Sequence, residues 1–313
     1  MNDGSPILFK YCGSTSVVHF GQHKGIPRYW CKDCQRKFAA NNALPKMQTP
    51  KAEIAAAVGM YYGGMPLDSI QRQLKQDYGD DVAESGIHNW VVRFSQEAID
   101  QSKDYYPEGI GDTWIADETC IKVGGAHGKQ VWFWDVIDAK TRYLLASRVT
   151  TTRGTNDAKL LLEQAANRAG KVPKRVRTDS LKAYIEGVEL AFGSETKHIQ
   201  STPFSGIEGT AKVERFHGTL KDRTKVVRGF KNMEHARLLT EGWLVHYNFM
   251  KQHSALGDIP PAQKLGNAAF NNWDDIVEHS HTTIAPSLRP RPFKEEAPHS
   301  VVRDRTFSRR RKF

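Results

Sequence analysis

Apolar residues recur at two different spacings along this chain and so divide it into regions. Between Pro50 and about Ala98 the spacing is three or four positions, as in Ile54, Val58 and Tyr61, which predicts helices. The predicted helices run from Pro50 to Gly63, from Pro66 to Lys75, and from a capping Ser85 onward. Three short helices joined by glycine-bearing turns fit either a helix-turn-helix module or a helical bundle with a packing role.

Residues 112 to about 230 carry shorter apolar runs that are typical of strands. The predicted strands are 114–123, 131–137, 143–149, 175–179 and 198–199, and the predicted helices between them are 156–169 and 181–190. Three successive strands followed by alternating helices and strands predict an α/β fold, a mixed sheet with flanking helices. A further helix is expected to contain Trp243, Leu244 and Tyr247.

The chain has 313 residues and a formal net charge of +10, so we expect two or more domains and a polyanionic partner, most economically DNA. Basic but otherwise ordinary soluble proteins share this charge balance. No apolar run reaches membrane-spanning length and no signal peptide is evident, which predicts a cytoplasmic, nucleoid-associated protein. Four cysteines do not form a secreted disulfide framework, so reduced thiols or metal ligands are expected.

The first segment, residues 1–45, resembles half of a zinc ribbon. Cys31 and Cys34 form one complete Cys-x-x-Cys knuckle, whereas Phe9 stands where a second knuckle with Cys12 would need a thiolate. His19 or His23 is an alternative fourth ligand, without the usual spacing. The hypotheses are therefore a structural Zn²⁺ held by Cys12, Cys31 and Cys34, or a metal-free remnant packed by aromatic residues.

Three carboxylates lie at notable positions in the predicted strands and helices. Asp117 lies inside an apolar strand, Asp179 ends another strand, and Glu214 begins a helical stretch. A buried charge costs several kcal/mol unless it is paired, and divalent metal is a common partner for clustered carboxylates. Each acid has an alternative: Asp179 as a helix cap, Glu214 as an exposed acid, and Asp135 or Asp138 as replacements. Glu118 should face away from Asp117 and be structural.

These acids and their surroundings resemble the DDE transposases of prokaryotic insertion sequences, whose catalytic core is similar to that of retroviral integrases. The resemblance rests on Asp117-Glu118-Thr119, Thr178-Asp179-Ser180 and Val213-Glu214-Arg215-Phe216-His217, and it extends to Tyr247-Asn248 and His253-Ser254-Ala255-Leu256. Glu214 follows Asp179 by 35 positions, which is similar to the family spacing. Lys221 matches a basic residue that the family places two helical turns after the last acid.

The resemblance implies a ribonuclease H-like catalytic domain over 110–268, preceded by a helix-turn-helix DNA-binding domain over 46–105. It implies cleavage of element ends and joining of the 3′-OH to target DNA by two-metal-ion phosphoryl transfer. Asp117, Asp179 and Glu214 would hold two Mg²⁺, with Mn²⁺ as a substitute in vitro. The partners implied are the terminal inverted repeats, target DNA and further copies of the chain, which would bridge two ends.

Several polar residues are candidate DNA contacts. Residues 269–313 form a predicted basic tail without a packed core. The candidate contacts are Lys221, His217, Arg93, His88, Asn89, Arg309, Arg310 and Arg311, with helix packing as the alternative for His217. Two other functions use the same features: a ribonuclease H-like junction nuclease, and a non-catalytic DNA-binding regulator descended from a transposase.

Overall fold

The structure, a computed structural model, describes residues 7–280 except 24, 46, 125–127, 201–216, 219, 221–229 and 267. Contacts divide the chain into a unit ending at Ser280 and a second unit, 281–313, that lies outside the described residues. Among the described helices, none combines the length and the apolar character needed to span a bilayer.

The larger sheet has five strands in the order β6-β5-β4-β7-β8. Its strands are β4 (Thr113–Val123), β5 (Lys129–Asp138), β6 (Leu144–Thr150), β7 (Arg175–Thr178) and β8 (Lys197–Gln200). The first three form an antiparallel meander, and β7 and β8 add in parallel to β4. This confirms the predicted mixed α/β sheet, and the strand bounds differ from the expected ones by only a few residues.

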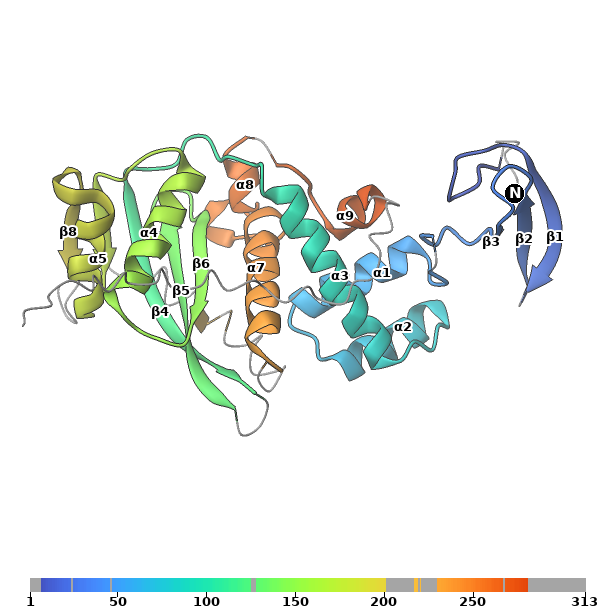
Figure 1. Cartoon of the computed structure of the whole chain (residues 1–313), viewed down its shortest axis with the longest axis horizontal. Helices are drawn as coiled ribbons and strands as arrows, with labels where there is room; N and C mark the ends of the chain where they lie inside the picture. The colour runs from blue at the N-terminus through green and yellow to red at the C-terminus, as the bar shows by residue number, and fades with distance from the viewer. Residues whose placement is uncertain are drawn as a thin grey trace, which may run out of the picture. The chain divides into compact units, whose positions relative to one another are not determined.

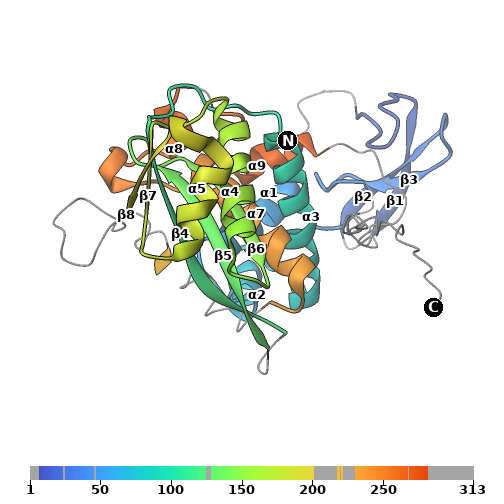
Figure 2. The same cartoon turned by 60° about the vertical axis from the view of Figure 1, so that its left-hand side comes forward.

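Helices α4 (Thr155–Ala169) and α5 (Lys182–Phe192) pack against each other and cover one face of this sheet (Figures 1 and 2). The crossover from β6 to β7 supplies α4, as expected where a parallel strand follows an antiparallel meander. Trp134 of β5 meets Tyr184 of α5 edge to face. The strand residues that alternate with Trp134 point to the opposite face, where Asp135 lies.

Helix α7 (Met233–Phe249) packs against the edge strand β6 and against α3 (Glu84–Ser102). An edge strand leaves backbone groups without a strand partner. Here the buried Asn248 accepts from the Leu144 amide at 2.8 Å and donates to the Leu144 carbonyl at 2.9 Å. The side chain of Asn248 therefore replaces a missing strand partner at this point of β6.

The three predicted N-terminal helices are present as α1 (Lys51–Tyr62), α2 (Leu67–Tyr78) and α3. They contact one another and share one hydrophobic cluster with the sheet. The described part of this unit also contains four short segments: η2 (Gly193–Glu195), η3 (Ser254–Leu256), α8 (Pro261–Lys264) and α9 (Trp273–His279).

Residues 269–280 lie within the packed unit, which differs from the predicted tail beginning at 269. Trp273 of α9 is 5% exposed and stacks on Tyr62 of α1, with ring centroids 5.1 Å apart. Burial of this indole explains the difference, because a segment with a large buried aromatic side chain gains enough apolar contact to stay packed.

Gly242 of α7 accommodates Tyr62, whose hydroxyl shares a 2.5 Å hydrogen bond with Ser95. A Cβ atom at position 242 would stand 2.1 Å from the Tyr62 hydroxyl oxygen. We therefore expect Gly242→Ala to destabilise the fold by about 1–3 kcal/mol in urea unfolding, despite the better helix propensity of alanine.

Two variants test that explanation. Gly59→Ala, in the interior of α1, would meet only Trp273 at an ordinary 3.5 Å and should be neutral or stabilising. Tyr62→Phe removes the obstructing hydroxyl, so it should lower the cost of Gly242→Ala in a double-mutant cycle. Equal costs of Gly242→Ala in both backgrounds would contradict the packing argument.

Residues 7–45 form a separate small sheet of β1 (Val17–His23), β2 (Ile26–Cys31) and β3 (Lys37–Ala39), in that order and antiparallel. Its buried cluster consists of Phe9, Cys31 and Phe38, joined by half-buried neighbours. So small an apolar core is marginal by itself, and domains of this size commonly depend on a metal or disulfide.

Candidate active site and metal centres

Oxygen atoms of three acids, Asp117, Glu118 and Asp179, lie within 4.8 Å of one another. Strand β4 supplies the first two, and Asp179 directly follows β7. The parallel pairing runs to Ile115 with Arg177, so Asp179 emerges beside Asp117 where β7 ends. The sequence placed Asp117 and Asp179 on two strands as candidate ligands of one metal site, and the structure shows that these strands are parallel neighbours.

Glu118 was expected to face away from Asp117 and be structural. It does belong to the opposite face of β4, where it pairs across the strands with Trp134, yet its carboxylate still approaches the other two acids. Arg153 donates to Glu118 from both Nε, at 2.9 Å, and Nη2. The Arg153 guanidinium also lies 4.3 Å from the ring centroid of Trp132. Glu118 thus forms an ion pair with Arg153 and also lies close to Asp117 and Asp179.

Asp117 is mostly buried, and burial raises the pKa of its carboxyl to about 7. Burial also raises the pKa of Glu118, against the opposing effect of Arg153. These acids repel one another when ionised, whereas a divalent cation would favour their charged forms. A cluster of three carboxylates with one arginine therefore fits a hard metal ion such as Mg²⁺ or Mn²⁺ by its donor atoms.

His217 lies between two aspartates. Its Nε2 is 2.7 Å from Oδ2 of Asp135, and its Nδ1 is 3.4 Å from Oδ2 of Asp117. Asp135 stands directly opposite Asp117 on β5 and is fully buried, and this burial raises its pKa. His217 is itself only 5% exposed, which favours the packing alternative over a contact with DNA.

Asp135 and Asp138, the alternatives to one of the three predicted acids, lie in different surroundings. Asp135 lies next to the acid cluster, because His217 contacts both Asp135 and Asp117. Asp138 accepts hydrogen bonds from the Thr141 amide and hydroxyl and from the Gly111 amide. It closes the β5–β6 turn and is therefore a structural residue.

The remaining predicted active-site residues, Glu214 and Lys221, lie outside the described residues, as do Arg309, Arg310 and Arg311. Of the three positions on α3, Asn89 is exposed, while His88 and Arg93 are half-buried. His88 approaches His235 of α7, and Arg93 donates to the Met47 sulfur at 3.4 Å. The helix-turn-helix function stays a prediction.

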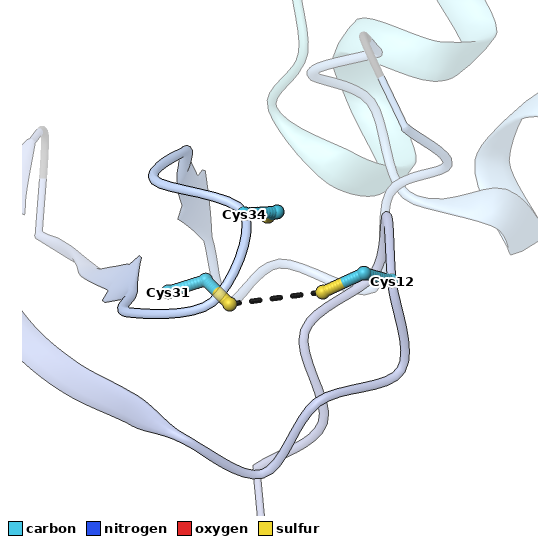
Figure 3. Close-up of side chains that lie close together, drawn as sticks. All are labelled: Cys12, Cys31 and Cys34. Carbon is cyan, nitrogen blue, oxygen red and sulfur yellow. Dashed lines mark hydrogen bonds between the residues drawn. The ribbon is translucent and has the colours of Figure 1, made fainter.

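A second cluster joins the three cysteines of the small N-terminal sheet (Figure 3). The sulfur atoms of Cys12 and Cys31 are 3.7 Å apart, and Cys34 completes the group. Zn–S bonds of about 2.3 Å place two thiolates on one tetrahedral ion roughly 3.8 Å apart. The observed separation matches that edge and is far longer than a disulfide bond of about 2.05 Å.

The local backbone favours a thiolate at Cys31, whereas burial and the neighbouring thiols raise the pKa of Cys34 to about 11. Burial opposes ionisation of Cys31, but amides of Cys34 and Asp33 and the neighbouring thiols together hold its pKa below the usual value. Phe9 precedes the Cys12 turn and accepts hydrogen bonds from the amides of Cys12 and Gly13, as a first knuckle residue would. Among the described residues, neither His19 nor His23 belongs to this cluster, because both lie exposed on β1.

Comparison with known proteins places these features in context. A family model described as a DDE domain matches residues 111–253. The insertion element IS476 uncharacterized 39.2 kDa protein of Xanthomonas euvesicatoria is 29% identical over 170 residues, which cover 53% of this chain and 47% of that protein. The chain thus matches about half the length of this curated relative.

Solved structures resemble this chain with lower sequence identity. The HTLV-2 integrase catalytic core domain in complex with magnesium has 16% identity and a TM-score of 0.38, covering 50% of this chain and 97% of that one. The BIV integrase catalytic core domain has 20% identity and a TM-score of 0.36, covering 49% and 92%. With TM-scores this low, the description of the fold rests on the strand order alone.

Proposed function

Because a family model described as a DDE domain matches residues 111–253, we propose that this chain is a DNA transposase. The proposed reaction cleaves the ends of an insertion sequence and joins the freed 3′-OH to target DNA. The observation that carries this proposal is the convergence of Asp117, within β4, and Asp179, just after the parallel neighbouring strand β7. The five-stranded order, in which parallel strands extend an antiparallel meander, is that expected of a ribonuclease H-like fold.

We assign Asp117, Asp179 and Glu214 as the residues that would hold two divalent metal ions. Bound Mg²⁺ would activate the attacking oxygen and neutralise charge on the leaving oxygen. Asp117 on β4 and Asp179 directly after β7 supply oxygen donors from neighbouring parts of one sheet, an arrangement suited to holding metal ions beside a scissile phosphate. No covalent protein–DNA intermediate is required, so no serine or tyrosine nucleophile is assigned.

DNA contacts are proposed outside the acid cluster. Lys221 would contact phosphate near the scissile bond, and Arg309, Arg310 and Arg311 would add sequence-independent affinity. Asn89 is the exposed candidate on α3, with His88 and Arg93 beside it. The protein would act in the cytoplasm as an oligomer that holds two element ends.

The experiment that tests this function is mobility of a marked element flanked by the native neighbouring DNA. Wild type or Asp179→Asn would be supplied in trans. Movement that requires Asp179 supports the transposase. No movement with either protein, despite expression and binding to the ends, would favour the non-catalytic regulator. Cleavage of branched DNA without movement would favour the junction nuclease.

We also propose that the cluster of Cys12, Cys31 and Cys34 holds a structural Zn²⁺. The support is the 3.7 Å sulfur separation, the small apolar core of this sheet and the amide donors around Cys31. Zinc is tetrahedral, so a fourth ligand from solvent or another molecule would complete the site.

Purification without chelator is expected to yield about one zinc per chain. Cys31→Ser should lose most of that zinc, because it removes the most buried thiolate. Cys120→Ser is the matched control, since Cys120 lies on β4 and outside the cluster. Elemental analysis of the three proteins makes this comparison, and near-zero zinc in the wild type would support the metal-free remnant.

A further inference from the structure

The small N-terminal sheet has two chemically different faces. Side chains alternate along each strand, so Tyr29 and Cys31 of β2 and Phe38 of β3 point toward the buried cluster. The residues between them point outward. Val18 of β1, Trp30 of β2 and Lys37 of β3 follow one another across this outer face in the strand register.

Phe20 of β1 is the centre of the outer face and is 45% exposed. The Lys37 ammonium lies 3.8 Å from the Phe20 ring centroid, and the Arg28 guanidinium lies 5.9 Å from it. The Trp30 ring is 6.2 Å from the Phe20 ring and 5.7 Å from Lys37. Two aromatic rings and two cations thus form one compact surface drawn from all three strands.

This surface is not explained by packing. The buried cluster lies on the other face, and a large exposed aromatic ring contributes little to stability. The segment that carries these cations also contains almost no acidic residues. Asp33 is the only acidic residue between positions 7 and 45, and it accepts a hydrogen bond from Ser14 at 2.5 Å.

The charge of the segment identifies the ligand chemistry. Whereas Asp33 is the one acid between positions 7 and 45, the same segment contains six lysines and arginines: Lys10, Lys24, Arg28, Lys32, Arg36 and Lys37. Aromatic rings that alternate with cations suit a single-stranded nucleic acid, whose unpaired bases stack on the rings while the phosphates meet the cations. A paired duplex offers its phosphates but not its base faces to such a surface.

We propose that the outer face of this sheet, formed by Phe20, Arg28, Trp30 and Lys37, binds single-stranded DNA. The bases stack on Phe20 and Trp30, and the backbone lies along Arg28 and Lys37. This binding function is separate from the acid cluster and requires neither metal nor cleavage.

The test measures binding of a fluorescent oligo(dT) strand, and of a duplex of equal length, to the full chain carrying Asp179→Asn, without metal. Phe20→Ala is expected to weaken oligo(dT) binding at least about fivefold, with a smaller change for the duplex. Leu8→Ala is the matched control, because Leu8 is a 57% exposed apolar residue of the same segment outside the strands. Circular dichroism checks that both variants keep their fold.

Salt dependence tests the role of the cation. Lys37→Ala should reduce the slope of log affinity against log salt by roughly 0.7, the value for one phosphate contact on a single strand. Lys32→Ala removes the same charge from the exposed turn after β2 and should change the slope less. Equal effects of the two lysine variants, or of Phe20→Ala and Leu8→Ala, would overturn the proposal. So would a loss of self-association in Phe20→Ala with unchanged DNA binding, because the face would then join two copies of the chain.

Discussion

Asp117→Asn is expected to abolish metal-dependent cleavage of DNA carrying the element ends, by at least about a thousandfold, while binding to the same DNA persists. The substitution keeps the size of the side chain and an oxygen that can accept from the Glu118 amide, a bond of 2.9 Å in the wild type. It removes the charge that would bind a divalent ion, and metal catalysis contributes several kcal/mol to such reactions. Gel analysis of a labelled end substrate in Mg²⁺ and in Mn²⁺ measures the effect.

Asp100→Asn is the matched control, because Asp100 is an exposed carboxylate on α3. Asp100→Asn should leave cleavage unchanged. This result would show that cleavage depends on the charge of Asp117 and not on the net charge of the protein. Substantial cleavage by folded Asp117→Asn would contradict the assignment of Asp117 as a metal ligand.

Glu118→Gln and Glu214→Gln distinguish two possible acid sets. The sequence assigns Asp117, Asp179 and Glu214, whereas the described residues bring Glu118 close to the first two acids. If Glu214 is the third ligand, Glu214→Gln should abolish cleavage and Glu118→Gln should reduce it less, through altered positioning of Arg153. The reverse order of effects would make Glu118 the third ligand.

Asn248→Ala is expected to destabilise the fold by about 3 kcal/mol or more. The amide of Asn248 satisfies both backbone groups of Leu144 in a fully buried position. Its removal leaves a buried N–H and a buried C=O unpaired, each at a cost of about 1–3 kcal/mol. Urea unfolding measures the change, and Asn156→Ala, at an exposed site in the first turn of α4, should stay within about 0.5 kcal/mol of wild type.

Asn248→Asp adds a pH test of the same contact. A protonated aspartic acid can still donate to the Leu144 carbonyl, whereas the charged form cannot and is buried. The folded protein therefore holds this proton to a higher pH than the unfolded chain, in which the pKa is about 3.9. The stability deficit relative to wild type should be small near pH 4 and grow as the pH rises. A deficit independent of pH would contradict the two-bond geometry.

The order of the elements follows from patterns that are local in the sequence. The strand and helix periods around Asp117 and Asp179 predicted a mixed sheet with both acids on its strands. The tertiary structure showed that these two strands are parallel neighbours. The cysteine spacing left a zinc site and a metal-free remnant as alternatives, and in the structure the three thiols lie together. The family motifs also marked Asn248, although without a reason for an asparagine at that position.

Other features depend on how segments distant in the sequence pack. The Asp135–His217 contact spans 82 positions, and the Asn248–Leu144 contact spans 104. The approach of Asp179 to Asp117 and Glu118 requires β7 to pair beside β4 and to end at Thr178. The docking of α9 requires Trp273 to stack on Tyr62. The sequence by itself thus determined which residues share a strand, a helix face or a knuckle. Only the tertiary structure decided which residues contact one another. The period of the sequence pattern sets the face on which a side chain lies, whereas the register and packing of the other elements set its contacts.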